Sequence, residues 1–312
     1  MSNLTSMSTF LLLGFSDIRE LQILHFFVFL VLYLMAIMGN FLIIVVVVCD
    51  HHLHTPMYFF LMNLAMMDLG TISVMVPKSM AVSLLNSRFM SYSGCIAQVF
   101  FSYFFGTSDL ALLTIMAHDR YVAICNPLQY ELIMNRGACM RMVAIVWIIS
   151  LLNATLHAGC TFANTFCSNA VNQFFCEIPR LLKLSCTDFY LVEVGFLVLG
   201  WSIGLGCFIF IIITYVQIFS TVRRIPSVHG QKKALSTCLP HLMVVSVFMF
   251  TGVFAYAKPP TDAASNVDIA FAVVYTIIPP TLNPFIYSMR NKEIKIAMWK
   301  LLDYRHSSKN IF

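Results

Sequence analysis

Long runs of apolar residues alternate along the chain with short polar segments. From His25 to Cys49 no Asp, Glu, Lys or Arg occurs. Because about 20 apolar residues in a helix cross the hydrocarbon core of a bilayer, this run predicts a membrane-spanning helix. It is too long for the core of a signal peptide and has no basic region before it. Six more predicted spans follow at Met57–Met80, Ser93–Cys125, Ala138–Gly159, Leu191–Val222, Ala234–Ala257 and Asp268–Ser288.

Seven spans predict an all-α membrane protein, a seven-transmembrane helix bundle. Residues 1–24 are the expected extracellular N-terminus, residues 25–288 the seven-transmembrane domain, and residues 289–312 a cytoplasmic tail. In the tail, Arg290–Leu302 interleaves apolar residues with lysines, which predicts a short amphipathic C-terminal helix on the inner leaflet. Only 11% of the residues are charged, where about a quarter is usual in soluble proteins, so membrane lipid is the expected surrounding.

The basic residues indicate which end of each span faces the cytoplasm. An odd number of spans places the two termini on opposite sides. With the N-terminus outside, 13 of the 19 Lys and Arg residues lie on the cytoplasmic side and 6 lie elsewhere. Cytoplasmic loops carry such an excess, so we expect a multi-pass plasma-membrane protein with an extracellular N-terminus. The net charge of +5 then reflects contact with an acidic inner leaflet, and nucleic acid is not an expected partner.

One glycosylation sequon supports the same orientation. Asn3, followed by Leu4 and Thr5, matches the acceptor pattern for N-glycosylation and lies on the proposed outer side. We therefore expect a glycan on Asn3.

Two carboxylates lie deep in the predicted spans, Asp68 in the second and Asp109 in the third. An ionisable group inside a bilayer costs roughly 2.5–3.5 kcal/mol on insertion scales, so both residues are functional candidates. Asn40 in the first span and Asn283 in the seventh fall at compatible depths. Two interpretations remain open. One is a small-cation site, such as a sodium site; the other is a water-filled hydrogen-bond network with one acid protonated, because two neighbouring carboxylates rarely both ionise.

An acid–base pair marks the cytoplasmic end of the third span, where MAHDRYVAIC places Asp119 next to Arg120. Asp119 can neutralise Arg120 in one conformation and a partner can receive Arg120 in another, which suits a switch. In the seventh span Pro284 removes a backbone hydrogen bond, and Asn283 can satisfy the freed carbonyl. Together with Tyr287 this predicts a hinge.

The ten cysteines fall into two groups. Four lie on the expected outer side, at Cys95, Cys167, Cys176 and Cys186. That side is oxidising, so disulfides are expected there, but four cysteines allow three pairings and the spacing does not choose among them. The other six lie in spans or near the cytoplasm and are expected to be free thiols.

Four longer stretches, in order, resemble one protein family. They are LHTPMYFFLMNLAMMDL (Leu53–Leu69), MAHDRYVAIC (Met116–Cys125), KALSTCLPH (Lys233–His241) and PPTLNPFIYSMRN (Pro279–Asn291). The DRY and NPxIY motifs within them resemble rhodopsin-like G-protein-coupled receptors. The four stretches together resemble the vertebrate olfactory receptors, in the tetrapod-type (class II) branch. The resemblance extends from about Phe10 to Lys300.

The resemblance implies disulfides, a partner and a signalling surface. Cys95 would bond to Cys176 and Cys167 to Cys186, although the spacing from Cys167 to Cys176 is one residue shorter than the family's usual one. The expected partner is a heterotrimeric stimulatory, olfactory-type G protein that raises cAMP. The residues expected to couple to it or to switch are Asp119, Arg120, Tyr215, Arg223, Lys232, Lys233, Asn283, Pro284 and Tyr287.

The resemblance also places an odorant in the outer half of the bundle. The expected ligand-binding residues are Ser102, Tyr103, Gly106, Thr107 and Leu110 on the third span, Leu199, Gly200 and Ile203 on the fifth, Gly252, Val253 and Tyr256 on the sixth, and Tyr275 and Thr276 on the seventh. Apolar walls with a few hydroxyls suit a small neutral volatile of micromolar or weaker potency. Ordinary helix packing remains the alternative for each of these residues. No cofactor and no metal ion is expected.

Three departures from the family's usual residues are present. His118 stands where Tyr is usual, Asp109 where Glu is usual, and Phe248-Met249-Phe250 where the sequence FYG is usual. In the family, the last segment relays ligand binding to the inner half of the bundle. The resemblance therefore does not predict how readily a ligand activates this chain.

Other functional classes fit the sequence less well than a receptor does. A transporter is expected to carry inverted repeats or broken polar helices, and the sequence has no internal repeat. A membrane enzyme would need more than the metal-like spacings of His51–His54 and of Cys238 with His241. A chemosensory receptor with a role outside olfaction has the same chemistry as an odorant receptor.

Overall fold

The computed structural model describes residues 8–13, 18–85, 87–171, 174–186, 190–257 and 266–308. Side chains are described within these ranges except at 253–257, 266–272, 289–290 and 302–308. The predicted glycosylation site, Asn3, lies outside the described residues.

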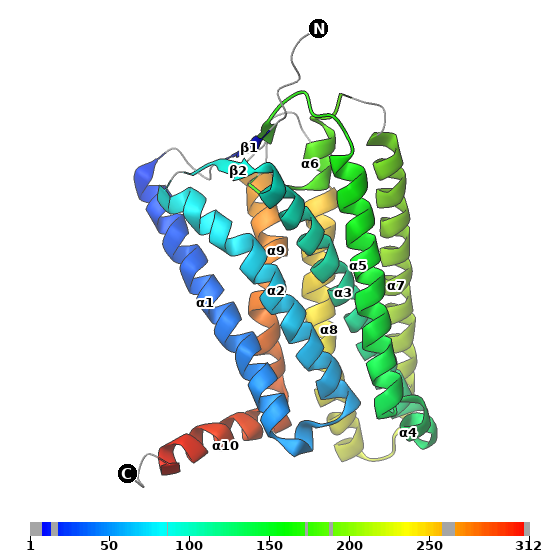
Figure 1. Ribbon diagram of the computed structural model, residues 1–312. Helices are drawn as coiled ribbons and strands as arrows, with labels where there is room; N and C mark the ends of the chain where they lie inside the picture. Colours follow the sequence, from blue (N-terminus) through cyan, green and yellow to red (C-terminus); the bar gives the residue numbers. More distant parts are fainter. Residues whose placement is uncertain are drawn as a thin grey trace.

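Seven long helices form a bundle, and each corresponds to one predicted span (Figure 1). They are α1 (Arg19–Cys49), α2 (Pro56–Leu85), α3 (Tyr92–Cys125), α5 (Arg136–Phe162), α7 (Tyr190–Arg224), α8 (Val228–Ala257) and α9 (Asn266–Arg290). Among the described residues, the first six helices are long and apolar enough to cross a membrane. The seventh, α9, packs against α1, α2 and α8. The protein is therefore an all-α membrane bundle of seven helices.

The helices extend beyond the apolar runs that predicted them. One example is α1, which begins at Arg19 instead of His25, and there Arg19 donates to the side chain of Gln22 at 3.1 Å. Apolar sequence marks only the part of a helix inside the hydrocarbon core, whereas backbone hydrogen bonding continues into the headgroup region.

Short elements close the two ends of the bundle. The end that carries α10 (Lys292–Ser308), here called the α10 end, also holds η1 (His51–Leu53), η2 (Pro127–Gln129) and α4 (Tyr130–Ile133). The opposite end holds α6 (Ile178–Leu182) and a small sheet, and is here called the sheet end.

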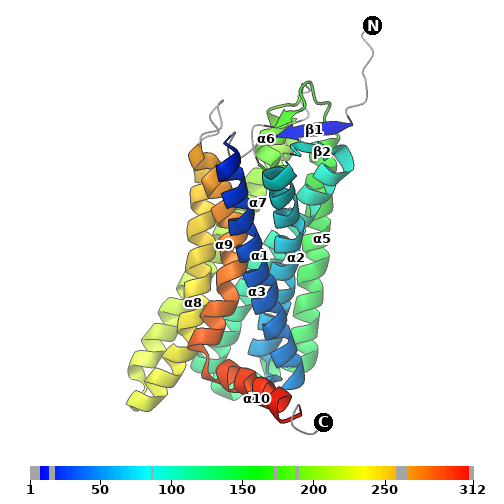
Figure 2. The same cartoon turned by 90° about the vertical axis from the view of Figure 1, so that its left-hand side faces the viewer.

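The predicted amphipathic helix is present as α10, which runs across the bundle beneath α1 (Figure 2). It starts two residues after the predicted Arg290 and continues past the predicted end at Leu302 to Ser308. The change of direction is set at Asn291, whose side-chain oxygen accepts from the backbone N–H groups of Glu293 at 3.0 Å and Ile294 at 3.3 Å. Such a cap starts a new helix.

Three short strands form a sheet that the sequence did not predict. They are β1 (Thr9–Leu12), β2 (Phe89–Ser91) and β3 (Ala170–Val171), in the order β2-β1-β3, with β1 antiparallel to β2 and parallel to β3. Phe10 and Leu12 are buried beneath it, against Cys95 and Val171. Strand β1 is thus part of the packed structure at the sheet end.

Packing differs between the two halves of the bundle. The largest cluster of buried apolar side chains fills the half toward the α10 end and includes Leu64, Leu113 and Tyr215. In α7, no residue between Glu193 and Ile211 is buried. The half toward the sheet end is therefore more loosely packed around α7.

Candidate functional site

Two disulfides fasten the segment between α5 and α7 to the bundle. The structure joins Cys95 to Cys176, with 5.6 Å between the Cα atoms, and Cys167 to Cys186, with 5.8 Å. These are the pairs that the family resemblance implied. The other six cysteines are free thiols.

The same segment covers the sheet end of the bundle. Phe174 and Phe175 are buried and pack against Met75 of α2. Just beyond, Glu177 accepts a hydrogen bond from the hydroxyl of Tyr275 in α9 at 3.0 Å. Tyr275, predicted to contact the ligand, thus links α9 to the covering segment.

Two residues of the predicted ligand-binding face of α3 contact neighbouring helices, α2 and α5. The Ser102 hydroxyl lies beside Met75 of α2 and donates to the carbonyl of Gln98 at 2.6 Å. Thr107 accepts from the side chain of Asn153 in α5 at 3.0 Å. A Cβ atom added at Gly106 would meet nothing within 4 Å. Of Ser102, Gly106 and Thr107, only Gly106 therefore faces open space.

On α7, the residue that faces α3 lies one position beyond the predicted ones. Leu199 and Ile203 are more than half exposed, and a Cβ at Gly200 would meet nothing within 4 Å. Gly204 instead lies against α3, because a Cβ there would be 3.6 Å from Leu110 Cδ2. The α7 residue that faces Leu110 is therefore Gly204, which the sequence analysis did not select.

The predicted positions on α8 and α9 are only partly described. A Cβ added at Gly252 would meet nothing within 4 Å, while the side chains of Val253 and Tyr256 lie outside the described ones. Thr276 is buried, and its hydroxyl has no hydrogen-bond partner among the described residues.

A buried acid–base pair, which the sequence analysis missed, lies beside this region. His157 of α5 is 2.5 Å from a carboxylate oxygen of Glu193 in α7, and both side chains are buried. The Tyr103 ring lies 4.4 Å from the His157 ring, centroid to centroid. Glu193 Oε2 has no hydrogen-bond partner among the described residues. The pair joins three helices close to the predicted ligand-binding residues.

Of the four polar core residues, Asp68 and Asn283 are hydrogen-bonded to each other. Asn283 donates to Asp68 at 2.9 Å, and both are buried. Asp109 is also buried, its Oδ1 has no hydrogen-bond partner among the described residues, and it lies within electrostatic range of Asp68. Asn40 donates to the Pro280 carbonyl at 2.8 Å instead of joining the carboxylates.

The contact of Asn40 corrects one expectation about the hinge. Pro284 has no N–H to donate to the carbonyl four residues earlier, which belongs to Pro280. We expected Asn283 to satisfy this carbonyl, but Asn40 of α1 does so. A Cβ atom at Gly39 would lie 2.8 Å from Pro284, so glycine is what lets α1 approach α9 closely enough.

The acid–base pair at the α10 end is not joined in this conformation. Asp119 accepts a hydrogen bond from the Tyr130 hydroxyl at 2.8 Å. Burial, and then the charge of Asp119, raise the pKa of Tyr130 above its ordinary value of 10.0, so this phenol keeps its proton. Among the described residues, no ion pair joins Asp119 to Arg120, and Arg120 Nε has no hydrogen-bond partner although Arg120 is buried.

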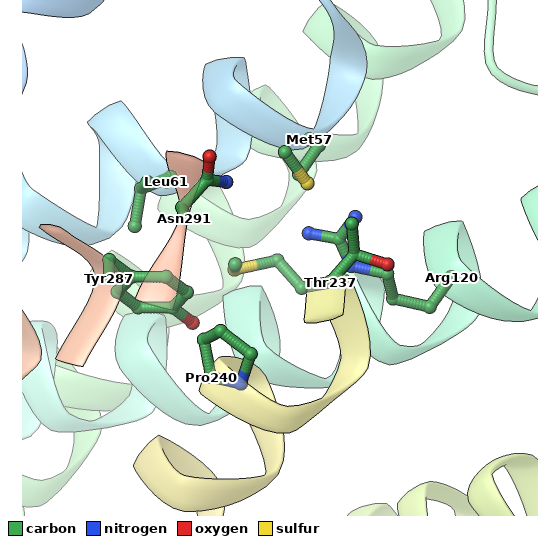
Figure 3. A pocket seen from close by; sticks show the side chains of 8 residues that line it. Met57, Leu61, Arg120, Thr237, Pro240, Tyr287 and Asn291 are labelled. Atoms are coloured by element: carbon green, nitrogen blue, oxygen red, sulfur yellow. The ribbon is translucent and has the colours of Figure 1, made fainter. Parts of the chain in front are cut away.

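Arg120 lines a cavity of about 10 Å³ at the α10 end (Figure 3). The cavity is also lined by Met57, Leu61, Met116, Thr237, Pro240, Tyr287 and Asn291, which come from α2, α3, α8, α9 and the turn after α9. The Tyr287 hydroxyl is buried and without a hydrogen-bond partner among the described residues. Helices α8 and α9 thus close over Arg120.

Two groups of side-chain contacts hold this closed arrangement. The Tyr58 hydroxyl lies 2.5 Å from Glu293 Oε2 and 3.1 Å from Asn291 Oδ1, and joins α2 to the start of α10. Tyr215 of α7 is 2.7 Å from His241 Nδ1 of α8, and His241 Nε2 is 3.0 Å from the Leu113 carbonyl of α3.

The basic residues of the predicted signalling surface lie nearby. Arg223 at the end of α7 and Lys232 and Lys233 in the first turns of α8 are exposed. Tyr215, predicted with them, is buried. Exposed cations therefore surround an interior that holds Arg120.

The histidines with metal-like spacing have other contacts. His52 Nδ1 is 2.9 Å from Asp50, and His54 Nε2 is 3.3 Å from the Val48 carbonyl. Among the described residues, no three His, Cys, Asp or Glu side chains gather as a metal ion would require.

Comparison with known proteins identifies the family of the chain. Residues 29–305 match the family described as Olfactory receptor. The chain is similar to olfactory receptor 14A16 of Homo sapiens, with 48% identity over 303 residues, 97% of this chain and 98% of that protein. It is also similar to olfactory receptor 14I1 of Homo sapiens, with 50% identity over 302 residues, 96% of this chain and 97% of that protein. Olfactory receptor 14C36 of Homo sapiens is 49% identical over 312 residues, the whole of both chains. With its seven-helix bundle and these relatives along its full length, the chain belongs to the olfactory receptor family.

Proposed function

We propose that the protein binds a small neutral volatile in the sheet-end half of its bundle and activates a heterotrimeric stimulatory G protein at the α10 end, which raises cAMP. The proposal places the protein in the plasma membrane with the sheet end outside and a glycan on Asn3. The excess of Lys and Arg at the α10 end supports this orientation.

The state of Arg120 carries the proposal. It is a buried cation with an unpartnered Nε in a cavity that α8 and α9 close. A buried charge without a full set of partners is held at a cost of several kcal/mol, and a partner that supplies acceptors lowers this cost. A conformation that moves α8 and α9 apart would therefore offer Arg120 to a G protein, with Arg223, Lys232 and Lys233 at the rim.

The loose packing of the sheet-end half supports the proposed binding of a volatile there. Gly106 and Gly252 face open space, and α7 has no buried residue between Glu193 and Ile211. A bound molecule there would gain about 25 cal/mol per Å² of apolar surface, which gives about 5 kcal/mol for roughly 200 Å². That energy corresponds to weak binding, with one or two hydrogen bonds needed to reach micromolar affinity.

A cAMP assay in cells that express the chain with an olfactory-type G protein tests the proposal. A broad odorant panel is applied to the wild type and to Arg120→Ala, with surface expression measured for both. Arg141→Ala is the matched control, because Arg141 is an exposed arginine in α5 near the same end and, within the part of the chain that the structure describes, bonds only to its own helix at Gly137.

We expect an odorant response in the wild type and in Arg141→Ala, and none in Arg120→Ala at equal surface density. A response that survives Arg120→Ala undiminished contradicts the mechanism. A response that is coupled to another second messenger contradicts the choice of G protein and leaves the ligand site intact.

A further inference from the structure

A large groove opens on the outside of the bundle at the α10 end. It has a volume of about 1,030 Å³ and lies between α1, α9 and α10. Its walls include Met38, Phe41 and Val45 of α1 and Phe285 of α9, and α10 contributes Ala297 and Lys300. Ligand pockets have volumes of about 300–1,000 Å³, so this space, here called the α1–α10 groove, is large enough for a ligand.

The walls of the α1–α10 groove face outward and are apolar. Met38 is 69% exposed and Phe41 is 61% exposed, on a helix long and apolar enough to cross a membrane. Helix α10, which runs across beneath α1 (Figure 2), contributes Ala297, Lys300 and Leu301 to the lining. Trp299 of α10 is also exposed, and aromatic residues of this type collect at the interface between hydrocarbon and headgroups. The groove thus reaches from hydrocarbon depth to headgroup depth.

The rim of the groove is polar and carries an accessible cation. Lys300 Nζ lies 3.7 Å from Asp50 Oδ2, and the Lys300 side chain is 62% exposed. His51 and His52 lie on the same rim. His52 donates its backbone N–H to Asp50 at 3.0 Å and places its ring nitrogen 2.9 Å from the same oxygen.

These contacts hold the Lys300 ammonium over the groove. Chiefly the backbone N–H of His52, and then its ring, lower the pKa of Asp50 below its ordinary value of 3.8, so this carboxylate stays charged and keeps Lys300 near the rim. An exposed ion pair at this distance is weak, so a phosphate can draw Lys300 away from Asp50.

We propose that the α1–α10 groove binds one anionic phospholipid from the leaflet at the α10 end. An acyl chain occupies the apolar walls, and the phosphate contacts Lys300, with His51 as a further donor. Basic pockets at this depth between membrane helices recognise anionic headgroups, and each basic side chain contributes about fivefold in affinity. A lipid without net charge fills the same walls but gains nothing from Lys300.

The test uses the purified full-length chain in nanodiscs of phosphatidylcholine, with or without about one-fifth phosphatidylserine. Two quantities are measured, the midpoint of thermal unfolding and the phosphatidylserine retained after mild detergent extraction. Lys300→Gln removes the charge at the rim, and Lys295→Gln is its matched control, since Lys295 is an exposed lysine of α10 outside the groove lining.

We expect phosphatidylserine to raise the midpoint of the wild type and of Lys295→Gln, because a ligand that binds the folded state stabilises it. Lys300→Gln should lose this increase and retain about fivefold less phosphatidylserine. Asp50→Asn, which removes the competing carboxylate, should retain more than the wild type. Val45→Trp, which fills the groove and leaves its charges unchanged, should retain less.

Three results would overturn the proposal. They are a wild type indifferent to phosphatidylserine, a full effect in Lys300→Gln, and an equal loss in Lys295→Gln, which would indicate general attraction to an anionic surface. None of these measurements uses an odorant or a G protein. The lipid site and the proposed receptor function can therefore fail separately.

Discussion

The hydroxyl of Tyr58 provides the sharpest test of how the α10 end is held closed. Tyr58 of α2 is buried and lies 2.5 Å from Glu293 Oε2 and 3.1 Å from Asn291 Oδ1, next to the cavity of Arg120. Movement of α9 away from α2 would break this contact. Tyr58→Phe removes the hydroxyl and leaves the ring packing unchanged.

The size of the effect of Tyr58→Phe follows from the two acceptors of the Tyr58 hydroxyl. One proton serves both acceptors, and a hydrogen bond to a charged group contributes about 1.5–3 kcal/mol. Glu293 is exposed, so water can replace the phenol there, and the lower figure applies. About 1.4 kcal/mol is a factor of ten in an equilibrium. Loss of the bond should therefore raise the ratio of open to closed receptor, and with it the basal cAMP signal, by about tenfold.

The assay measures cAMP without odorant, divided by the amount of receptor at the cell surface. Tyr33→Phe is the control, because the Tyr33 ring packs in a cluster of α1, α2 and α9 and its hydroxyl makes no hydrogen bond among the described residues. Glu293→Gln should give a smaller increase, since an amide oxygen still accepts a hydrogen bond. An unchanged or lower basal signal in Tyr58→Phe at wild-type surface density would refute the reasoning.

Three further predictions concern a buried acid–base pair and two glycines of the bundle. Glu193→Leu should lower the free energy of unfolding by about 3–5 kcal/mol, because it leaves His157 buried without its acid. Glu193→Leu combined with His157→Leu should lower the free energy of unfolding less. Thermal unfolding in detergent measures both variants. Gly70→Ala should lower the free energy of unfolding by about 1–3 kcal/mol, since its Cβ would lie 2.2 Å from the Phe105 ring. Gly106→Ala meets no atom within 4 Å, so it should leave the unfolding midpoint unchanged and weaken the odorant response. Equal destabilisation by the two alanines, or equal stability of the single and double leucine variants, would contradict these accounts.

The spans could be predicted because a bilayer imposes one requirement on every segment that crosses it, about 20 apolar residues in a helix. The sheet could not be predicted in the same way. β3 has only two residues, and β1 pairs with partners about 80 and 160 positions away in the chain, so no local periodicity records it.

The switch residues show a second limit of the sequence. Asp119 and Arg120 are adjacent in the chain, but neighbouring residues on a helix point in different directions. Asp119 turns toward Tyr130 and Arg120 toward the interior. The pair of His157 and Glu193 was missed for a related reason. Glu193 stands near the edge of a predicted span, where a carboxylate would ordinarily contact water, and only the packing of α5 against α7 buries it.

The position of β1 at the centre of its sheet has a consequence for biosynthesis. Its neighbour β3 ends at Val171, so the sheet can form only after more than half of the chain has been translated. At about 5–20 residues per second, the wait from Leu12 to Val171 is about 8–32 seconds. Throughout that interval Phe10 and Leu12 have no permanent cover, and chaperones have access to them. The burial of Phe10 and Leu12 thus depends on a segment that is made about 160 residues later.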